Sequence, residues 1–267
     1  MPSPPDDPFA HFKARQRDSW AHFAPVEVFT APTAARLVRF AHVRAGQRVL
    51  DVATGTGVVA LSAARLGAEV TGLDLSPALL ERARDNAGLA EVAVTFQEGD
   101  AEALPFPDGS FDGVLSQFGH MFAPRADVAT REILRVLRPG GTVAFSTWPP
   151  EHFVGRFFAL AARYSPPPPP GLSPPPLWGD VGVVRERLGD AVTDLCFGRG
   201  VMRVNALSVQ HCGRVLEQTI GPVRALAESG DVEKLERFRL ELAALGAEYF
   251  EDNALRQDYL MTRAIKR

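Results

Sequence analysis

The chain has 267 residues, of which 46% are hydrophobic and 23% are charged, and its formal net charge is −3. These values are typical of a globular protein with one large domain or one domain and an added lobe. They lack the basic excess of nucleic-acid-binding proteins, so nucleic acid is an unlikely partner. The two cysteines, Cys196 and Cys212, have no metal-ligand spacing, and no metal is predicted. Without a signal peptide or a membrane span, a cytoplasmic location is expected.

The first 44 residues are predicted to form a disordered tail and a helical cap. Residues 1–8 are rich in proline and aspartate, a composition typical of disordered chain. Apolar residues then recur at helical spacing between Phe9 and Phe23, and a second helix is expected over residues 33–41. Residues 9–44 are therefore interpreted as an N-terminal helical cap.

Strand and helix patterns alternate through the next hundred residues. Strands are predicted over residues 48–52, 69–73, 92–98, 111–116 and 142–147, with helices over 58–66, 76–87 and 126–136. Such alternation is typical of an α/β fold with a doubly wound, mostly parallel sheet. Residues 45–150 are interpreted as a cofactor-binding core.

The remaining residues, 151–267, are expected to complete the sheet and to add helices on the substrate side. Eight prolines fall within residues 165–176, which should be extended. This segment is either a stiff connector or a wall of a substrate pocket. The pattern then predicts a helix over 181–188, one or two strands over 191–204, helices over 210–229 and 231–248, and a last strand over 259–265.

The most informative motif joins the first strand to the first helix of the core. Residues 49–57 read Val-Leu-Asp-Val-Ala-Thr-Gly-Thr-Gly, a buried strand that enters a glycine turn before a helix. Glycine permits backbone conformations closed to other residues, and the helix start presents free N–H groups to a polar ligand. The spacing Gly55-x-Gly57-x-x-Ala60 also fits nicotinamide and flavin enzymes.

Three aspartates distinguish a dinucleotide cofactor from an adenosine cofactor that carries a positive charge. Asp51 lies within the first strand, where its charge would repel a pyrophosphate but attract a cofactor with an amino group and a sulfonium. Asp74 ends the second strand and could accept hydrogen bonds from both ribose hydroxyls. Asp100 follows the third strand and could accept from the amine of adenine or make a turn. Together they favour a cationic adenosine cofactor.

At this point the sequence resembles the class I S-adenosylmethionine-dependent methyltransferases, and among them the ubiquinone/menaquinone-biosynthesis methyltransferase-like group of small-molecule enzymes. The resemblance covers about residues 45–150. It rests on residues 49–57, Asp74, Gly99-Asp100-Ala101, Leu104-Pro105-Phe106, Ser110-Phe111-Asp112 and Leu137-Arg138-Pro139-Gly140-Gly141. It implies a Rossmann-like, seven-stranded sheet whose last strand is antiparallel.

The resemblance also implies a role for individual residues around S-adenosylmethionine. The expected cofactor-binding residues are Asp51, Gly55 and Gly57 at the methionine end, with backbone from Ala53 and Thr54, Asp74 at the ribose, Leu75, Asp100 and Ala101 at adenine, and Gln117 facing cofactor and substrate. Trp20, in the N-terminal cap, is either part of a lid over the cofactor or core. His120, just past the fourth strand, is either a general base or a packed residue.

The predicted function is methyl transfer to a small-molecule acceptor. Several aromatic residues follow the fourth and fifth strands, where ligands bind in such sheets, so an apolar or aromatic acceptor is expected. A nicotinamide-dependent oxidoreductase and a non-catalytic S-adenosylmethionine-binding module are the alternatives. The protein is expected to be a monomer or a homodimer.

Overall fold

A single sheet forms the centre of the computed structural model, which describes residues 7–267 and contains eight strands in that range. The strand order is β3-β2-β1-β4-β5-β8-β6, and β7 pairs only with β8. Strands β1 to β5 are parallel, and β8 is antiparallel to β5, β6 and β7. The strands are β1 (Arg48–Val52), β2 (Glu69–Asp74), β3 (Thr95–Glu98), β4 (Phe111–Gln117), β5 (Leu137–Thr147), β6 (Val192–Asn205), β7 (Phe250–Glu251) and β8 (Ala254–Lys266).

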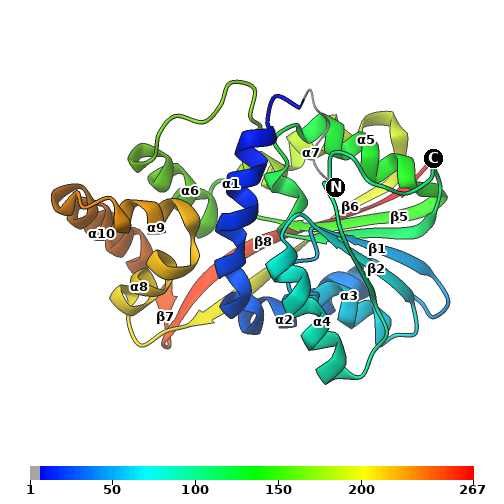
Figure 1. Ribbon diagram of the computed structural model, residues 1–267, viewed down its shortest axis with the longest axis horizontal. Coiled ribbons are helices and arrows are strands. Elements are labelled where there is room, and N and C mark those ends of the chain that lie inside the picture. Colours follow the sequence, from blue (N-terminus) through cyan, green and yellow to red (C-terminus); the bar gives the residue numbers. More distant parts are fainter. Residues whose placement is uncertain (1–6) are drawn as a thin grey trace.

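Helices cover both faces of the sheet (Figure 1). In the view of Figure 1, α2, α3 and α4 lie below the sheet, and α5 and α7 lie above it. The α-helices are α1 (Ala10–Trp20), α2 (Glu27–Phe40), α3 (Val58–Ala64), α4 (Pro77–Ala90), α5 (Ala126–Val136), α6 (Phe153–Tyr164), α7 (Val181–Leu188), α8 (Val209–Thr219), α9 (Gly221–Glu228) and α10 (Val232–Ala247). The 3-10 helices are η1 (Ala21–Val26), η2 (His120–Phe122), η3 (Pro175–Gly179) and η4 (Gly189–Ala191). The architecture is the predicted Rossmann-like α/β fold.

The predicted alternation and the antiparallel last strand are confirmed, and the sheet gains only the two-residue β7. The chain order reverses between β1 and β4, which pair although β2 and β3 come between them in sequence. At such a reversal the loops after the two strands turn to opposite faces and leave a crevice. The fold therefore places a binding crevice at the carboxyl ends of β1 and β4.

Several predicted helix boundaries were wrong, for local reasons. The helix predicted over residues 210–229 is two helices, because Ile220, with φ −103° and ψ 112°, leaves the helical conformation, and Pro222 in the first turn of the second helix has no N–H with which to continue the first. The helix expected to begin at residue 33 begins at Glu27 and continues through Pro32. Helix α6 was not predicted, since its apolar residues were interpreted only as an aromatic set.

Strands β6 and β8 extend past the end of β5 as a two-stranded ribbon. The pairing of β5 with β8 ends at Thr147 and Leu260, whereas β6 and β8 remain paired as far as Asn205 and Ala254. Helices α8, α9 and α10 lie between β6 and β8 in sequence, and Figure 1 shows them beside α6 at the free end of the ribbon. The C-terminal part thus completes the sheet and adds a helical lobe.

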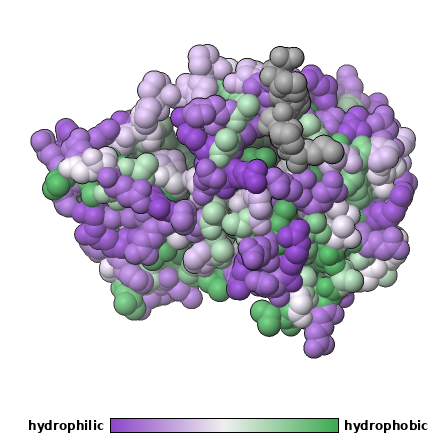
Figure 2. Space-filling view, viewed as in Figure 1, coloured by the Kyte–Doolittle hydropathy of each residue, from purple (hydrophilic) through white to green (hydrophobic). Residues whose placement is uncertain are grey.

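The apolar core has two parts, one on each face of the sheet. The part between the sheet and helices α2 and α3 includes Leu37, Val49 and Leu115. The part on the other face includes Leu137, Trp178 and Tyr259. The molecular surface seen from the same side is mostly hydrophilic (Figure 2). None of the helices within residues 7–267 is long and apolar enough to cross a membrane.

The predictions for the N-terminal tail and for the proline-rich segment compare differently with the structure. The predicted disordered tail, residues 1–8, lies outside the described residues except for Asp7 and Pro8, and the Asp7 carboxylate is buried against Lys13. The proline-rich segment, residues 165–176, has no regular structure until η3 begins at Pro175. It does not contribute to the main cavity, which agrees with a connector rather than a pocket wall.

Candidate active site

One large cavity lies at the carboxyl ends of β1 to β4 and continues beneath α1 to the β6–β8 ribbon. Its volume is about 320 Å³. We call its two ends the glycine-turn half and the aromatic half. The glycine-turn half is lined by Lys13, Ala53, Thr54, Gly55, Thr56, Leu73, Asp74, Leu75, Gly99, Asp100 and Ala101. The aromatic half is lined by Trp20, Phe23, Phe122, Phe153, Phe157, Phe158, Met202, Val204, Cys212, Leu216, Ile220 and Gln257.

The turn after β1 has a left-handed backbone at three of five consecutive residues, with φ +55° at Ala53, +56° at Gly55 and +84° at Gly57. A Cβ atom at Gly55 would meet nothing within 4 Å, so this residue leaves its side open. A Cβ atom at Gly57 would come within 3.2 Å of both Ala83 and Phe96. Gly55 therefore opens the cavity, while Gly57, which does not line it, allows the turn to pack on α4 and β3.

Asp51 lies on the buried side of this turn and stabilises it by hydrogen bonds. Its Oδ2 accepts hydrogen bonds from Thr54 Oγ1 at 2.5 Å and from the backbone N–H of Ala60 at 3.1 Å. Its Oδ1 is buried and has no partner among the described residues. Burial raises the pKa of Asp51 to about 7, with the nearby charge of Asp74 acting in the same direction. Contrary to the prediction, Asp51 does not line the cavity.

Asp74 lines the cavity and ties the turn to β2. Its Oδ2 accepts from the N–H of Gly55 at 2.8 Å, and its Oδ1 accepts from the N–H of Ser76 at 2.9 Å. Burial raises the pKa of Asp74 above the usual range of a carboxyl group. Each carboxylate oxygen has a second lone pair, so Asp74 can still accept hydrogen bonds from a ligand. Leu75 lines the cavity beside it.

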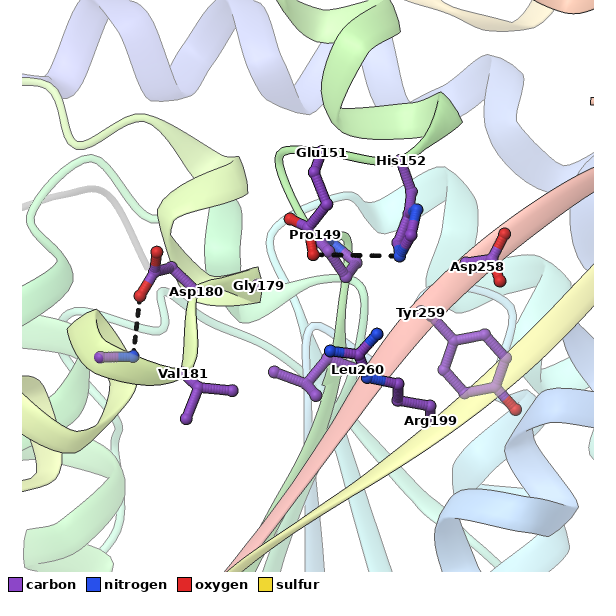
Figure 3. A pocket seen from close by; sticks show the side chains of 11 residues that line it. Pro149, Glu151, His152, Gly179, Asp180, Val181, Arg199, Asp258, Tyr259 and Leu260 are labelled. Atoms are coloured by element: carbon purple, nitrogen blue, oxygen red, sulfur yellow. Dashed lines mark hydrogen bonds and ion pairs between the residues drawn. The ribbon is translucent and has the colours of Figure 1, made fainter. Parts of the chain in front are cut away.

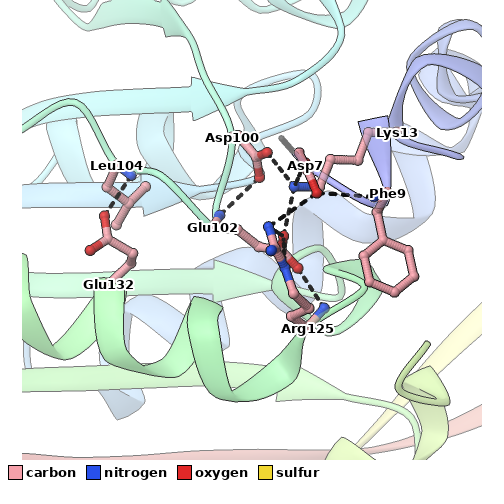
Figure 4. Close-up of polar contacts among 8 residues, drawn as sticks. All are labelled: Asp7, Phe9, Lys13, Asp100, Glu102, Leu104, Arg125 and Glu132. Atoms are coloured by element: carbon pink, nitrogen blue, oxygen red, sulfur yellow. Dashed lines mark hydrogen bonds and ion pairs between the residues drawn. The ribbon is translucent and has the colours of Figure 1, made fainter. Parts of the chain in front are cut away.

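Asp100 and Ala101 also line the cavity, but Asp100 is not free. Its Oδ2 accepts a hydrogen bond of 2.6 Å from the ammonium of Lys13, and its Oδ1 accepts from the N–H of Glu102 at 2.8 Å (Figure 4). Lys13 belongs to α1, which crosses the cavity mouth from the N-terminal cap. Asp100 thus lines the cavity and also contacts the cap, and the sequence did not predict the second contact.

The end of β4 supplies Gln117, Phe118 and Gly119 to the cavity wall. Gln117 Nε2 donates to the carbonyl of Thr30 at 3.0 Å, which fixes the side-chain amide. Its Oε1 is buried and has no partner in the described part of the chain. Phe118 has φ +58°, a conformation that is rare for a bulky side chain. Gly119 is required by space, because a Cβ atom there would lie 2.5 Å from the Cβ of Ala53.

His120 does not reach the cavity, which contradicts its predicted role as a general base. The residue is only 1% exposed, and its ring packs 4.5 Å from that of Phe145 and 4.6 Å from that of Trp178. Neither ring nitrogen has a hydrogen-bond partner within residues 7–267, and burial lowers the pKa of His120 to about 3. His120 is therefore the packed residue of the two alternatives.

Trp20 lines the aromatic half and begins a chain of ring contacts across it. Its ring lies 4.8 Å from that of Phe122, which lies 5.8 Å from Phe158, which in turn lies 5.9 Å from Phe157. The rings come from α1, η2 and α6, three elements far apart in sequence. Trp20 is thus part of the cover over the cavity rather than of the closed core.

Five ionisable side chains line the cavity within the described residues, and none is a free base. They are Lys13, Glu27, Asp74, Asp100 and Cys212. Glu27 accepts from Arg82 and Asn86, and the partners of Lys13, Asp74 and Asp100 are given above. Burial raises the pKa of the Cys212 thiol to about 11, so it keeps its proton at neutral pH. The cavity is therefore suited to a ligand that needs no proton removed.

A second pocket lies at the end of β5, between the starts of α6 and α7 (Figure 3). Its rim carries charges of both signs, including Glu151 and Arg199, and the side chains of Glu151 and His152 lie 3.9 Å apart. Asp180 is already engaged, because its Oδ1 caps α7 by accepting from the N–H groups of Gly182 and Val183. This pocket lacks the strained turn and fixed acceptors of the main cavity.

Sequence reasoning missed most of the residues that α1, α6, α8 and the ribbon bring to the cavity. Lys13 of α1, Leu216 of α8 and Met202 of the ribbon are examples. A signal existed for α1, since Phe12, Gln16 and Trp20 fall on one face at helical spacing. The residues of α6 and α8 carry no motif, and only the packing of the lobe brings them together.

The chain is similar to known proteins over its core and over its full length. Residues 50–145 match a protein family described as "Methyltransferase domain". An uncharacterised protein of Mycobacterium tuberculosis is 38% identical over 263 residues, which cover 95% of both chains. A demethylmenaquinone methyltransferase of Thermus thermophilus is 44% identical over 117 residues, covering 43% of this chain and 53% of that protein.

Solved structures agree with the fold. Phosphoethanolamine N-methyltransferase 2 of Haemonchus contortus, solved with phosphomonomethylethanolamine and S-adenosylhomocysteine, superposes with a TM-score of 0.62 at 20% identity. The match covers 98% of this chain and 61% of that chain. With the strand order, the glycine turn and the aspartates after β2 and β3, these similarities place the chain in the class I S-adenosylmethionine-dependent methyltransferases.

Proposed function

We propose that the protein transfers a methyl group from S-adenosylmethionine to a small apolar or aromatic acceptor. The observation that carries this proposal is the continuity of the cavity, which joins the glycine turn to a chamber of aromatic rings without an intervening wall. A methyl donor and its acceptor must meet in one space from which water is excluded. A cavity with one polar end and one apolar end suits that pair.

The glycine-turn half fits the cofactor. The open side of Gly55 leaves room for a ligand against the turn, and Gln117 Oε1 is a buried acceptor to which none of residues 7–267 donates. In this proposal Asp74 accepts hydrogen bonds from the ribose hydroxyls, and Asp100 and Ala101 contact the edge of adenine. Gln117 accepts a hydrogen bond from a donor at the methionine end of the cofactor. When bound, the cofactor supplies an electrophilic methyl group on a sulfonium.

The aromatic half supports the nature of the acceptor. Its walls are aromatic rings and aliphatic side chains, with Gln257 and Thr219 among the few polar residues. Because no lining side chain among the described residues is a free base, the acceptor must bring a nucleophile that is already unprotonated. A hydroxyl or thiol that ionises near neutral pH, on an apolar body, meets this requirement.

Ligand binding and methyl transfer test the proposal in sequence. S-Adenosylhomocysteine at 100 times its dissociation constant should stabilise the protein by about 2.7 kcal/mol, seen as a higher Tm, whereas NADH should not. Labelled S-adenosylmethionine should then transfer its methyl group to members of a panel of aromatic hydroxyl compounds and thiols. Stabilisation by NADH alone would contradict the proposal in favour of an oxidoreductase. Binding of S-adenosylhomocysteine without transfer to any extract component would favour a non-catalytic module.

A further inference from the structure

Helix α1 is attached to the glycine-turn half by a cluster of buried charges. The ammonium of Lys13 lies 2.7 Å from Asp7 Oδ2, 2.6 Å from Asp100 Oδ2 and 2.6 Å from Glu102 Oε2 (Figure 4). An ammonium has three hydrogens, and each has a carboxylate to receive it. Lys13 itself is 4% exposed, so these contacts are shielded from water. The cluster joins the N-terminal cap to the loop after β3.

Lys13 occupies the place at which three carboxylates converge. Oxygen atoms of Asp7, Asp100 and Glu102 lie within 4.8 Å of one another, a spacing that would also suit a metal ion. Arg125 adds a second cation, with Nη2 at 2.7 Å from Glu102 Oε2 and at 3.2 Å from Asp7 Oδ1. The three carboxylates and the two cations therefore leave the cluster with a formal charge of only −1. Loss of Lys13 would leave three carboxylates facing one arginine.

This cluster is the main buried attachment of α1. Lys13 is the only buried residue of the helix, whose other cavity-lining side chains, such as Phe12 and Gln16, are half-buried. The one other ion pair of α1 within the described residues joins Arg17 to Glu98 at 3.1 Å, and both of those side chains are substantially exposed. Exposed pairs contribute little to stability. The position of α1 over the cavity therefore depends on Lys13.

The attachment lies in the cavity wall itself. Lys13 and Asp100 both line the cavity, and Trp20, at the far end of α1, covers the aromatic half through its contact with Phe122. The same ammonium thus fixes one oxygen of Asp100, the residue proposed to receive adenine, and holds a helix across both halves. Burial alone would lower the pKa of Lys13, but its bonds to Asp100, Asp7 and Glu102 outweigh this and hold the pKa above the usual value.

We propose that Lys13 is a positioning residue for the cofactor: it orients Asp100 and secures α1 as the cover of the cavity. This inference rests on the proposed function, since it assumes that the glycine-turn half holds S-adenosylmethionine. It assigns the N-terminal cap a role in cofactor retention that the glycine turn cannot fill alone. The expected consequence is that the cluster controls cofactor affinity without touching the methyl acceptor.

The test compares Lys13→Met with Lys13→Arg and with Arg17→Met on the same helix. Affinity for S-adenosylhomocysteine is measured by titration calorimetry, and the order of α1 by amide hydrogen exchange over residues 10–20. Lys13→Met should weaken binding at least about tenfold and accelerate exchange in α1, while exchange in β1 and β4 stays slow. Lys13→Arg, which keeps the charge, should recover most of the affinity. Arg17→Met should bind within about twofold of the unchanged protein.

The outcomes separate this inference from the proposed function. If the unchanged protein does not bind S-adenosylhomocysteine, the proposed function fails. If it binds and Lys13→Met binds equally well, only the role of Lys13 is overturned. Should Lys13→Met not fold, Asp7→Asn weakens the same cluster without altering a cavity-lining residue. That variant should lose at least about threefold in affinity with faster exchange in α1, and unchanged values for both would overturn the inference.

Discussion

The two halves of the cavity are built on opposite principles. In the glycine-turn half, Asp74 and Asp100 are held by backbone N–H groups and by Lys13, and the turn contains left-handed residues that the surrounding structure must maintain. In the aromatic half, rings from separate elements meet edge to face, and few polar groups fix a ligand. One half is preorganised for a single polar ligand, whereas the other selects by shape and apolar area.

This difference suggests a division of labour between the halves. A ligand that is the same in many reactions can be bound by hydrogen-bond partners in fixed positions. Because these partners are already ordered, little free energy is lost in ordering them when the ligand binds. An acceptor that differs from protein to protein is better served by walls that can change without disturbing the cofactor. Substitutions at the join, in each half and outside both should therefore have distinct effects, which range from general unfolding to a change confined to the acceptor.

Gly119→Ala, at the join of the two halves, should have the largest effect. The new Cβ would lie 2.5 Å from Ala53 Cβ and 2.8 Å from Ala53 O, and Ala53 is already held at φ +55°. We expect a loss of about 3 kcal/mol in the free energy of unfolding, measured with urea, and no binding of S-adenosylhomocysteine.

Gly88→Ala is the matched control for that change. Gly88 lies in α4, and a Cβ atom there would meet nothing within 4 Å. The same substitution should stabilise the protein by about 0.5–1 kcal/mol, because glycine is unfavourable inside a helix. Equal stability of both variants would contradict the close packing of the β1 and β4 ends.

Asp74→Asn should damage the glycine-turn half alone. Asp74 accepts from two backbone N–H groups, and an amide can offer an oxygen to only one of them while its NH₂ group faces the other. We expect about 100-fold weaker binding of S-adenosylhomocysteine by calorimetry, which corresponds to about 2.7 kcal/mol. Asp112→Asn provides the control, since Asp112 also accepts a backbone N–H, from Arg48 at 2.7 Å, but does not line the cavity. A similar loss of affinity in both variants would deny Asp74 a role in the site.

The contrast between the halves also explains what the sequence could predict. The glycine-turn half is formed by short segments that follow successive strands, so residues 49–57, Asp74 and Asp100 revealed it through their local spacing. The doubly wound, mostly parallel sheet followed from the alternation of strands and helices, and the antiparallel last strand followed from the family that the motifs resemble. Lys13 was missed because its three carboxylate partners are scattered from Asp7 to Glu102, and no local pattern records such a meeting.

The aromatic half was predicted only as a tendency. Phe122, Phe153 and Phe158 were recognised as apolar residues near strand ends. Leu216 belongs to the helical lobe and Met202 to the ribbon, and neither was predicted to line the cavity. His120 shows the opposite failure. Its place after β4 indicated chemistry, yet the two residues that pack around its ring, Phe145 and Trp178, come from β5 and from η3. Long-range packing decides both cases.

His120→Leu should alter pH dependence while leaving both halves intact. The folded pKa of about 3 lies below the ordinary value of 6.5, so below pH 6.5 the unfolded chain binds a proton that the folded protein does not. His120 therefore costs stability as the pH falls from about 6.5 toward 3. Between pH 8 and pH 5 the free energy of unfolding of the variant should rise by about 2 kcal/mol relative to the unchanged protein. Parallel pH profiles in urea unfolding would show that His120 is not buried in its neutral form, and loss of methyl transfer would restore it as a catalytic candidate.

Phe158→Ala should have the smallest effect on the fold and act only on the aromatic half. The ring is half-buried, faces the cavity and contacts Phe122 and Phe157 at centroid distances of 5.8 and 5.9 Å. Its removal should cost about 1 kcal/mol of stability, since part of its surface already faces open space. Affinity for S-adenosylhomocysteine should stay within about twofold, while the KM for an acceptor found with the labelled cofactor should rise about tenfold. Calorimetry and initial-rate kinetics on the same preparation separate these effects. Weaker cofactor binding with an unchanged acceptor KM would place Phe158 in the wrong half, and the division of the cavity would then have to be redrawn.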